Sequence, residues 1–319
     1  MERRALGRTG TSVSRLILGC AGFGGFGSDF DLAGRGEDDA QAAAIMDAAW
    51  EYGIDTFDTA DAYGGGRSEQ AIGKWIRSRG VQPILTTKTF HPMAPGEDRG
   101  LGPARIRRQV ESSLGRLGVD RIDLYLTHEP DPETSLAETL DVLDELVAEG
   151  KIGAYGGSHL TADLLEQADG RYGWVQNSLS LLDQGDAHDV LPLVETRGLG
   201  YTPYSPLSGG WLTGKYRRGA TPPAESRMGL RPGPYEELDR DDVWQGIEQL
   251  RRWTNDHGIA MANAAYAWVL ADSRVTAMLI GPRRPEQLAS AVWSMELDLS
   301  PDDHALLASF FTPAVTPRP

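Results

Sequence analysis

The stretch at residues 19–27 reads GCAGFGGFG and follows an apolar run, RLILG, at residues 15–19. Its glycines at positions 22, 24 and 27 spell G-x-G-x-x-G, the pattern of the Rossmann dinucleotide-binding fingerprint. That fingerprint needs its third glycine at the start of a helix, because the helix N-terminus holds the pyrophosphate. Here SDFDLAGRGEDDA follows Gly27, and helical periodicity begins only near Asp38. The stretch is therefore interpreted as the first βα loop of a different α/β architecture.

Apolar runs rich in β-forming residues recur along the chain, with helical patterns between them. Such alternation predicts a parallel sheet covered by helices. Eight units in 319 residues match a (β/α)₈ TIM barrel, which takes about 250 residues plus insertions. We expect one barrel domain over residues 1–319, and the strand runs begin at Arg15, Gly53, Pro83, Arg121, Lys151, Trp174, Gly198 and Val275.

Three segments lie outside the eight units. Residues 1–15 predict a β-hairpin that closes the bottom of the barrel, with GRTGT as its turn. Residues 208–236 are dense in Gly and Pro and predict a long loop after strand seven, and an extra helix follows from Asp241. Among the regular helices, one is expected to begin at Pro103 and another after an N-cap at Thr134 or Ser135.

The charge balance limits the possible partners. Asp and Glu total 46 against 31 Lys and Arg, a formal net charge of -15. Such a chain repels nucleic-acid phosphates and anionic membrane surfaces, so neither is expected as a partner. No apolar run approaches the ~20 residues that span a bilayer, and the single cysteine, Cys20, allows no intramolecular disulfide. These features predict a cytoplasmic protein, and no metal site is expected.

Three successive strand runs each end in an ionisable residue. Asp58, Lys88 and His128 are in phase with the apolar residues of their runs, and Tyr63 follows Asp58 by five positions. In a barrel all four belong at the C-terminal face, where active sites are built. Taken singly each also fits a structural role, such as a helix cap for Asp58 or Asp61.

Together the four groups suit protonation of an oxygen. An ammonium at Lys88 favours the phenolate of Tyr63 and so makes the phenol a better acid, and Asp58 keeps Lys88 charged. His128 can orient a substrate oxygen by hydrogen bonding. None of these side chains delivers electrons, so a hydride-donating cofactor is implied.

The chain resembles the aldo-keto reductase family along essentially its whole length. The resemblance rests on six segments in order: DTADAYGGGRSEQAIGKWI at 58–76, TTK at 86–88, IDLYLTHEPDP at 122–132, VQNSLSLLD at 175–183, YTPYSPLSGGWLTGKY at 201–216 and LIGPRRPEQL at 279–288. It implies a catalytic tetrad of Asp58, Tyr63, Lys88 and His128, with Tyr63 as general acid. The cofactor-binding residues that it implies are Gly22, Phe23, Ser158, Gln176, Tyr204, Ser205, Pro206, Leu207, Gly209, Lys215, Arg227, Gly281, Arg283 and Gln287.

The sequence departs from the family pattern in three places. His159 replaces an asparagine that usually contacts the cofactor, and Ser290 and Ala291 stand where Glu-Asn often serves the adenine. Trp211 is bulkier than the usual residue and is expected, with Phe23, Phe26 and Phe30, either to form an apolar wall at the mouth or to lie in the core. Arg283 and Arg284 favour a 2′-phosphate, so NADPH is expected over NADH.

The resemblance predicts an NADPH-dependent reductase of a small-molecule aldehyde or ketone, and a sugar ketone fits as well as a broad aldehyde range. An alternative is a cofactor-binding regulatory subunit on the same fold with little turnover. A third hypothesis, a lyase or isomerase with Lys88 as a Schiff-base amine, is disfavoured by Asp58 and the cofactor segments.

Overall fold

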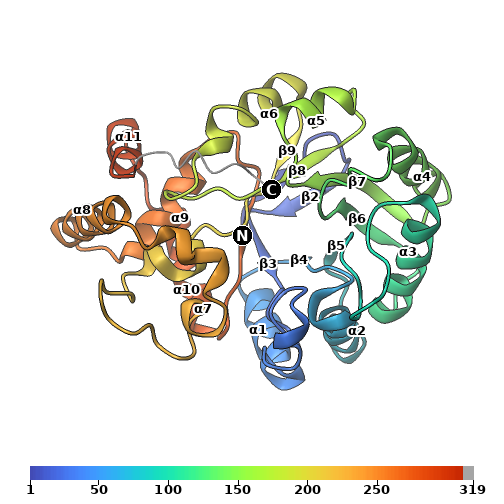
Figure 1. The fold of residues 1–319 in the computed structure, drawn as a ribbon, viewed down its shortest axis with the longest axis horizontal. Coiled ribbons are helices and arrows are strands. Elements are labelled where there is room, and N and C mark those ends of the chain that lie inside the picture. The colour runs from blue at the N-terminus through green and yellow to red at the C-terminus, as the bar shows by residue number, and fades with distance from the viewer. Residues whose placement is uncertain (312–319) are drawn as a thin grey trace.

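The computed structural model describes residues 1–311, and its centre is one sheet of eight parallel strands. The strand order is β10-β3-β4-β5-β6-β7-β8-β9. Backbone hydrogen bonds from Thr276 to Tyr201 (2.8 Å) and from Leu279 to Pro203 (2.9 Å) join the two ends of this order. The predicted barrel is thus confirmed (Figure 1). The strands are β3 (Leu16–Gly19), β4 (Thr56–Asp58), β5 (Ile84–Thr89), β6 (Ile122–Thr127), β7 (Ile152–Ser158), β8 (Trp174–Gln176), β9 (Gly200–Tyr201) and β10 (Met278–Ile280).

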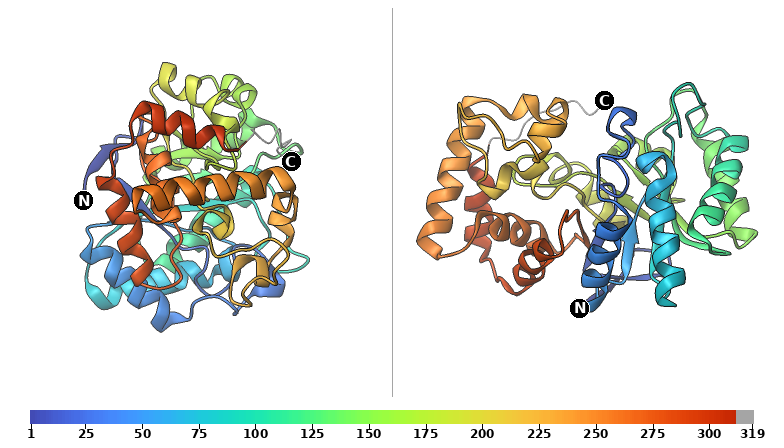
Figure 2. Two further views of the ribbon diagram at one scale, coloured as in Figure 1. Left: turned by 90° about the vertical axis from the view of Figure 1, so that its left-hand side faces the viewer. Right: turned by 90° about the horizontal axis from the view of Figure 1, so that it is seen from below.

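Helices surround this sheet, as Figure 1 shows. Figure 2 shows that the C-terminal helices, coloured orange to red, gather on the side opposite the cyan and green helices. Among residues 1–311 no helix is long and apolar enough to cross a membrane. The α-helices are α1 (Asp39–Glu51), α2 (Arg67–Arg79), α3 (Pro103–Leu117), α4 (Leu136–Ala148), α5 (Ala162–Gln167), α6 (Leu191–Arg197), α7 (Arg227–Leu230), α8 (Asp241–His257), α9 (Met261–Ala271), α10 (Glu286–Trp293) and α11 (Pro301–Ser309).

Local signals in the sequence account for several helix ends. Asp38 and Gln41 form a capping box at the start of α1, in which each side chain accepts a hydrogen bond from the other residue's backbone N–H. Pro103 occupies the first position of α3, as predicted. Of the two predicted caps for α4, Ser135 is the one used.

The N-terminal hairpin of β1 (Arg3–Ala5) and β2 (Ser12–Ser14) is confirmed, and it closes one end of the barrel. Its side chains Leu6 and Val13 are buried among the apolar residues of the barrel interior. Gly7, at the turn, has a φ of +50° and lies so close to Gly200 and Gly173 that a Cβ would collide with their backbone atoms. The hairpin therefore plugs the end of the barrel where β8 and β9 begin, and the interior cluster consists of Leu6, Val13, Ile17, Leu124, Leu126, Trp174, Ala277 and Leu279.

The glycine-rich first loop is not a Rossmann fingerprint. Gly27 is followed by a 3₁₀ turn, η1 (Phe30–Leu32), and α1 begins only at Asp39. The loop instead folds back on itself, because Glu37 N–H donates to Gly22 O and Gly24 N–H donates to Glu37 O, both at 2.8 Å. The prediction of a first βα loop is confirmed.

The long segment after strand seven is less irregular than predicted. It contains the short helices η4 (Ser208–Thr213), α7 and η5 (Gly233–Leu238) before the predicted extra helix, α8. Trp211 accounts for part of this regular structure, since its ring centre lies 4.9 Å from that of Trp244 on α8. The bulky residue thus packs the segment against the extra helix.

Candidate active site

Asp58 and Lys88 form a buried ion pair inside the barrel. They lie at the ends of the neighbouring strands β4 and β5, and only 4% and 1% of their side-chain surfaces are exposed. Lys88 Nζ donates to Asp58 Oδ1 and, at 2.8 Å, to Thr59 O. Burial alone would lower the pKa of Lys88, but Asp58 and Tyr63 together outweigh it and leave that pKa raised. Lys88 therefore stays a cation at neutral pH.

Tyr63 lies over this pair at the start of η2 (Tyr63–Gly66). Lys88 Nζ is 5.1 Å from the centre of its ring, and its hydroxyl is 3.4 Å from His128 Nε2. Burial raises the pKa of Tyr63, while the ammonium of Lys88 lowers it and Asp58 raises it again. The lowering expected from Lys88 is thus present but outweighed by burial. The phenol holds its proton at neutral pH, as a proton donor must.

His128 follows β6 and is buried beside Tyr63, with the two ring centres 5.4 Å apart. Burial, together with the charge of Lys88, holds the pKa of His128 well below its usual value. The imidazole is therefore neutral at pH 7. Within residues 1–311 its buried Nδ1 has no hydrogen-bond partner. The tetrad expected from the resemblance is thus brought together by the structure.

The residues expected to hold the nicotinamide lie next to this tetrad. Ser158 and Gln176 are paired neighbours at the ends of β7 and β8, and Gln176 Nε2 donates to Asp58 Oδ2 at 2.8 Å. The hydroxyl of Tyr204 is 3.0 Å from Nε2 of His159. His159 has a φ of +55°, a left-handed conformation that asparagine and histidine tolerate better than most residues. The left-handed backbone therefore explains why both the family's asparagine and the histidine of this chain are compatible with position 159.

The segment after Tyr204 forms a tightly curled turn. Ser205, Ser208 and Gly209 have φ values of +56°, +45° and +63°. A Cβ on Gly209 would collide with the ring of Tyr235 unless that ring moved, and the positive φ also favours glycine there. Backbone concavities built from such left-handed residues bind anions through their N–H groups. The turn, which also contains Pro206 and Leu207, thus fits a pyrophosphate.

Cationic side chains gather beside this turn. The guanidinium carbons of Arg227 and Arg283 lie 4.6 and 5.0 Å from the ring centre of Phe26. Arg283 Nε also donates at 2.8 Å to Oε1 of Glu37, whose other carboxylate oxygen is buried without a partner among residues 1–311. That unpartnered oxygen lies so close to Gly22 that a Cβ there would collide with it.

The other predicted cofactor residues lie around the same rim. Gln287 accepts hydrogen bonds from the backbone N–H groups of Arg283 (2.7 Å) and Arg284 (3.2 Å), and so fixes the loop before α10. Gly281 follows β10 with open space where a Cβ would lie. Lys215 is exposed, with Nζ 5.1 Å from the ring centre of Tyr216. The chain thus offers a curled backbone turn and several cations, which fit a dinucleotide.

The four aromatic residues Phe23, Phe26, Phe30 and Trp211 were expected either to form an apolar wall at the mouth or to lie in the core. The structure places three of the four in the core. Phe23, Phe26 and Trp211 are buried, with exposures of 1%, 0% and 2%, and only Phe30 is half-buried. The alternative that Asp58 or Asp61 serves as a helix cap is wrong, since α2 begins after Gly66 and neither residue caps it. The mouth is therefore less apolar than the sequence suggested.

Two polar residues at the mouth, His91 and Glu129, were missed by the sequence analysis, and a third, His159, was singled out there only as the replacement of a cofactor-contacting asparagine. His91, Glu129 and His159 come from the loops after β5, β6 and β7. Glu129 Oε1 lies 3.5 Å from Nε2 of His159 and 3.8 Å from Nε2 of His91. The ring of His91 also packs edge-on against that of His128, at 4.8 Å. Each residue follows the carboxyl end of a barrel strand, and that position was the available signal.

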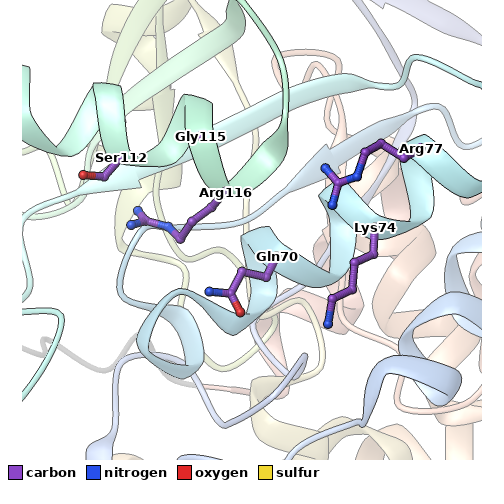
Figure 3. Close-up of a pocket in the computed structure, with 6 residues that line it drawn as sticks. All are labelled: Gln70, Lys74, Arg77, Ser112, Gly115 and Arg116. Carbon is purple, nitrogen blue, oxygen red and sulfur yellow. The ribbon is translucent and has the colours of Figure 1, made fainter.

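A separate hollow of about 410 Å³ lies on the outside of the barrel, between α2 and α3 (Figure 3). Two of its cations already have carboxylate partners, since Lys74 contacts Asp39 and Arg116 contacts Glu69. No tetrad residue lines it, so it is distinct from the candidate active site. Its lining residues are Gln70, Lys74, Arg77, Ser112, Gly115 and Arg116.

The sequence model of the aldo/keto reductase family matches residues 15–311. The chain belongs to this family. It is an NAD(P)H-dependent oxidoreductase, as the resemblance implied.

Several relatives match the aldo/keto reductase chain along nearly its full length. It is 35% identical to the uncharacterized oxidoreductase YrpG of Bacillus subtilis (strain 168), over 98% of this chain and 96% of the relative. It is 31% identical to an NADH-specific methylglyoxal reductase of Escherichia coli (strain K12), over 96% and 97%. It is also 29% identical to a probable voltage-gated potassium channel subunit beta of Arabidopsis thaliana, over 90% and 89%.

Proposed function

We propose that this aldo/keto reductase uses NADPH to reduce an aldehyde or ketone to an alcohol, with Tyr63 as the general acid. The observation that carries the proposal is the position of Tyr63, whose hydroxyl is 3.4 Å from His128 Nε2 and whose ring centre is 5.1 Å from Nζ of the charged Lys88. When bound, the nicotinamide would supply the hydride. The chain supplies the proton.

Each tetrad residue has a distinct task in moving that proton. Tyr63 gives its hydroxyl proton to the carbonyl oxygen as that oxygen gains negative charge. The ammonium of Lys88 stabilises the phenolate left behind, and Asp58 keeps that ammonium charged in its buried position. The neutral His128 orients the substrate oxygen through Nε2.

The choice of NADPH rests on the charges around Phe26. Burial lowers the pKa of Arg227. Tyr235 and Glu37 oppose this shift, while the charges of Arg283 and Arg231 add to it, so three guanidinium groups lie close together. Arg283 pairs with Glu37 and Arg231 pairs with Asp29, whereas within residues 1–311 Arg227 forms no ion pair. A 2′-phosphate would relieve this concentration of positive charge. The NADH-specific relative makes the comparison of both cofactors part of the test.

Two measurements test the proposed function. The first is fluorescence titration of the protein with NADPH and NADH, for which tighter NADPH binding is expected. The second is NADPH oxidation with a panel of aldehydes and ketones that includes methylglyoxal, the substrate named for one relative. Turnover on the panel supports the reductase, whereas cofactor binding without turnover on any carbonyl contradicts it.

A second candidate is a regulatory subunit that binds the cofactor but turns over slowly. Relatives named as potassium channel beta subunits, in Arabidopsis thaliana and in Oryza sativa subsp. japonica, each 29% identical, favour it. The assembled tetrad favours the enzyme. The same turnover assay separates the two, because a regulatory subunit would bind NADPH and leave the carbonyl panel unreduced.

A further inference from the structure

The polar group formed by His91, Glu129 and His159 is placed to contact the substrate. His91 packs against the catalytic His128, and His159 contacts the hydroxyl of Tyr204 on the cofactor side. The side chains of His91, Glu129 and His159 keep 30%, 25% and 27% of their surface exposed. Each side chain therefore keeps contact with solvent, and the cluster extends from His128 to Tyr204.

Glu129 is poorly satisfied in this position. Within residues 1–311 its carboxylate has only two partners, the imidazoles at 3.5 and 3.8 Å, and both distances are long for hydrogen bonds. Burial raises the pKa of Glu129 to about 7, which reflects the loss of water without compensating donors. A ligand group that donates a hydrogen bond to this carboxylate would restore what burial removed.

The surrounding charges select the kind of donor. Burial, together with the charges of Arg99, Arg105 and Arg231, lowers the pKa of His91 to about 4, so these guanidinium groups create a positive field at His91. That field disfavours an ammonium group on the substrate. An apolar substituent is also disfavoured, because it would remove the remaining water from Glu129 and offer no hydrogen bond. A neutral hydroxyl group meets both conditions.

We propose that His91, Glu129 and His159 bind a hydroxyl group of the substrate, so that hydroxylated aldehydes and ketones are preferred to their unsubstituted counterparts. This inference rests on the proposed carbonyl reduction and narrows its substrate class. The hydroxyl donates to Glu129 Oε1, and the neutral imidazoles donate to or accept from its oxygen according to their tautomers.

The test compares glyceraldehyde with propanal, which has the same carbon chain without hydroxyl groups. We expect kcat/KM with NADPH to favour glyceraldehyde by about 10- to 100-fold in the unmodified protein, since sites that hydrogen-bond a hydroxyl reject analogues that lack it. Glu129→Leu should lower this ratio at least tenfold, and the milder Glu129→Gln should lower it several-fold. NADPH titration of both variants reports whether the fold is intact.

Glu133→Gln is the matched control, because Glu133 is exposed in the same loop and should leave the ratio unchanged. A ratio near one in the unmodified protein, or a ratio unaffected by both Glu129 variants, overturns the hydroxyl subsite while the reductase stands. A preference for 3-aminopropanal over glyceraldehyde also overturns it, in favour of a cation site. No turnover on any carbonyl despite NADPH binding overturns the proposed function, and the subsite with it.

Discussion

The two sides of strand β5 carry two buried polar networks with different consequences. Lys88 points into the barrel, where it pairs with Asp58. Thr87 and Thr89 alternate with it and point outward, where they donate at 2.6 Å to Glu69 and Asp61. Arginines from α3 complete the outer network, since Arg105 donates to Thr89 Oγ1 at 2.7 Å and Arg116 to Glu69 Oε2 at 2.6 Å.

The difference shows that buried charge alone does not identify a catalytic site. The outer network lies between the sheet and helices α2 and α3, where Arg116 supplies the counter-charge for Glu69. The inner network extends through Tyr63 to His128 and the polar residues of the mouth. Access to the mouth, together with a group that holds a transferable proton, therefore distinguishes the inner network.

The largest effect is expected from removing one hydroxyl in the inner network. Tyr63→Phe should lower kcat for carbonyl reduction by about 10²–10⁴-fold, the usual contribution of a general acid. Its NADPH affinity, measured by fluorescence titration, should stay nearly unchanged. Tyr125→Phe removes the same group from β6, where burial and then the charges of Asp61 and Glu69 raise the pKa of Tyr125, and it should leave kcat unchanged. Unmodified turnover in Tyr63→Phe would remove that residue from the mechanism.

The second effect concerns stability and tests the buried pair itself. Lys88→Met leaves the carboxylate of Asp58 buried without its counter-ion, which should lower the free energy of unfolding at pH 7 by about 3–5 kcal/mol. The measurement is urea denaturation followed by circular dichroism. The double variant Asp58→Asn/Lys88→Met should recover most of that loss, because no unpaired charge remains. A double variant as unstable as the single one would show that Lys88 acts through packing.

A third, smaller effect is expected in the outer network, where Asp61 should make the free energy of unfolding depend on pH. Burial raises the pKa of Asp61 to about 7, and one of its carboxylate oxygens has no partner within residues 1–311. The folded state therefore binds a proton that the unfolded state releases, so Asp61 makes stability fall as pH rises from about 4 to about 7.

Asp61→Asn removes this titration. In urea denaturation its free energy of unfolding, relative to the unmodified protein, should be higher at pH 8 than at pH 5 by about 1–3 kcal/mol. Asp256→Asn, at an exposed position on α8, is the control and should show no such change. An equal difference at both pH values would mean that Asp61 is ionised throughout this range.

The sequence predicted the inner network better than the outer one for a physical reason. Alternation along a strand fixes which residues share a side, so Asp58, Lys88 and His128 could be placed together once a barrel was predicted. The partners of the outward side chains lie on α2 and α3, and no local pattern relates Glu69 to Thr87. Asp61 accordingly looked like a possible helix cap rather than a partner of Thr89.

The contacts among the polar residues of the mouth could not be predicted for the same physical reason. His91, Glu129 and His159 lie on three different loops, and their contacts depend on loop conformations such as the left-handed φ of His159. Strand periodicity says nothing about such conformations. The apolar residues of the first loop were more visible in the sequence, but Phe23 and Phe26 are buried in the structure.

The smallest effect is expected on cofactor binding, in a comparison of two arginines that each contact a buried glutamate. Arg283 pairs with Glu37 at the rim, and Arg116 pairs with Glu69 in the outer network. Arg283→Ala should weaken NADPH binding about tenfold and NADH binding much less, because a lost charge-assisted contact to the 2′-phosphate costs about 1.4 kcal/mol. Arg116→Ala should lower stability and leave both dissociation constants unchanged. Fluorescence titration of the two variants with NADPH and NADH is the measurement. Equal losses of affinity for both cofactors in Arg283→Ala would mean that the 2′-phosphate is recognised elsewhere. Arg283, like Arg116, would then serve mainly to neutralise its glutamate.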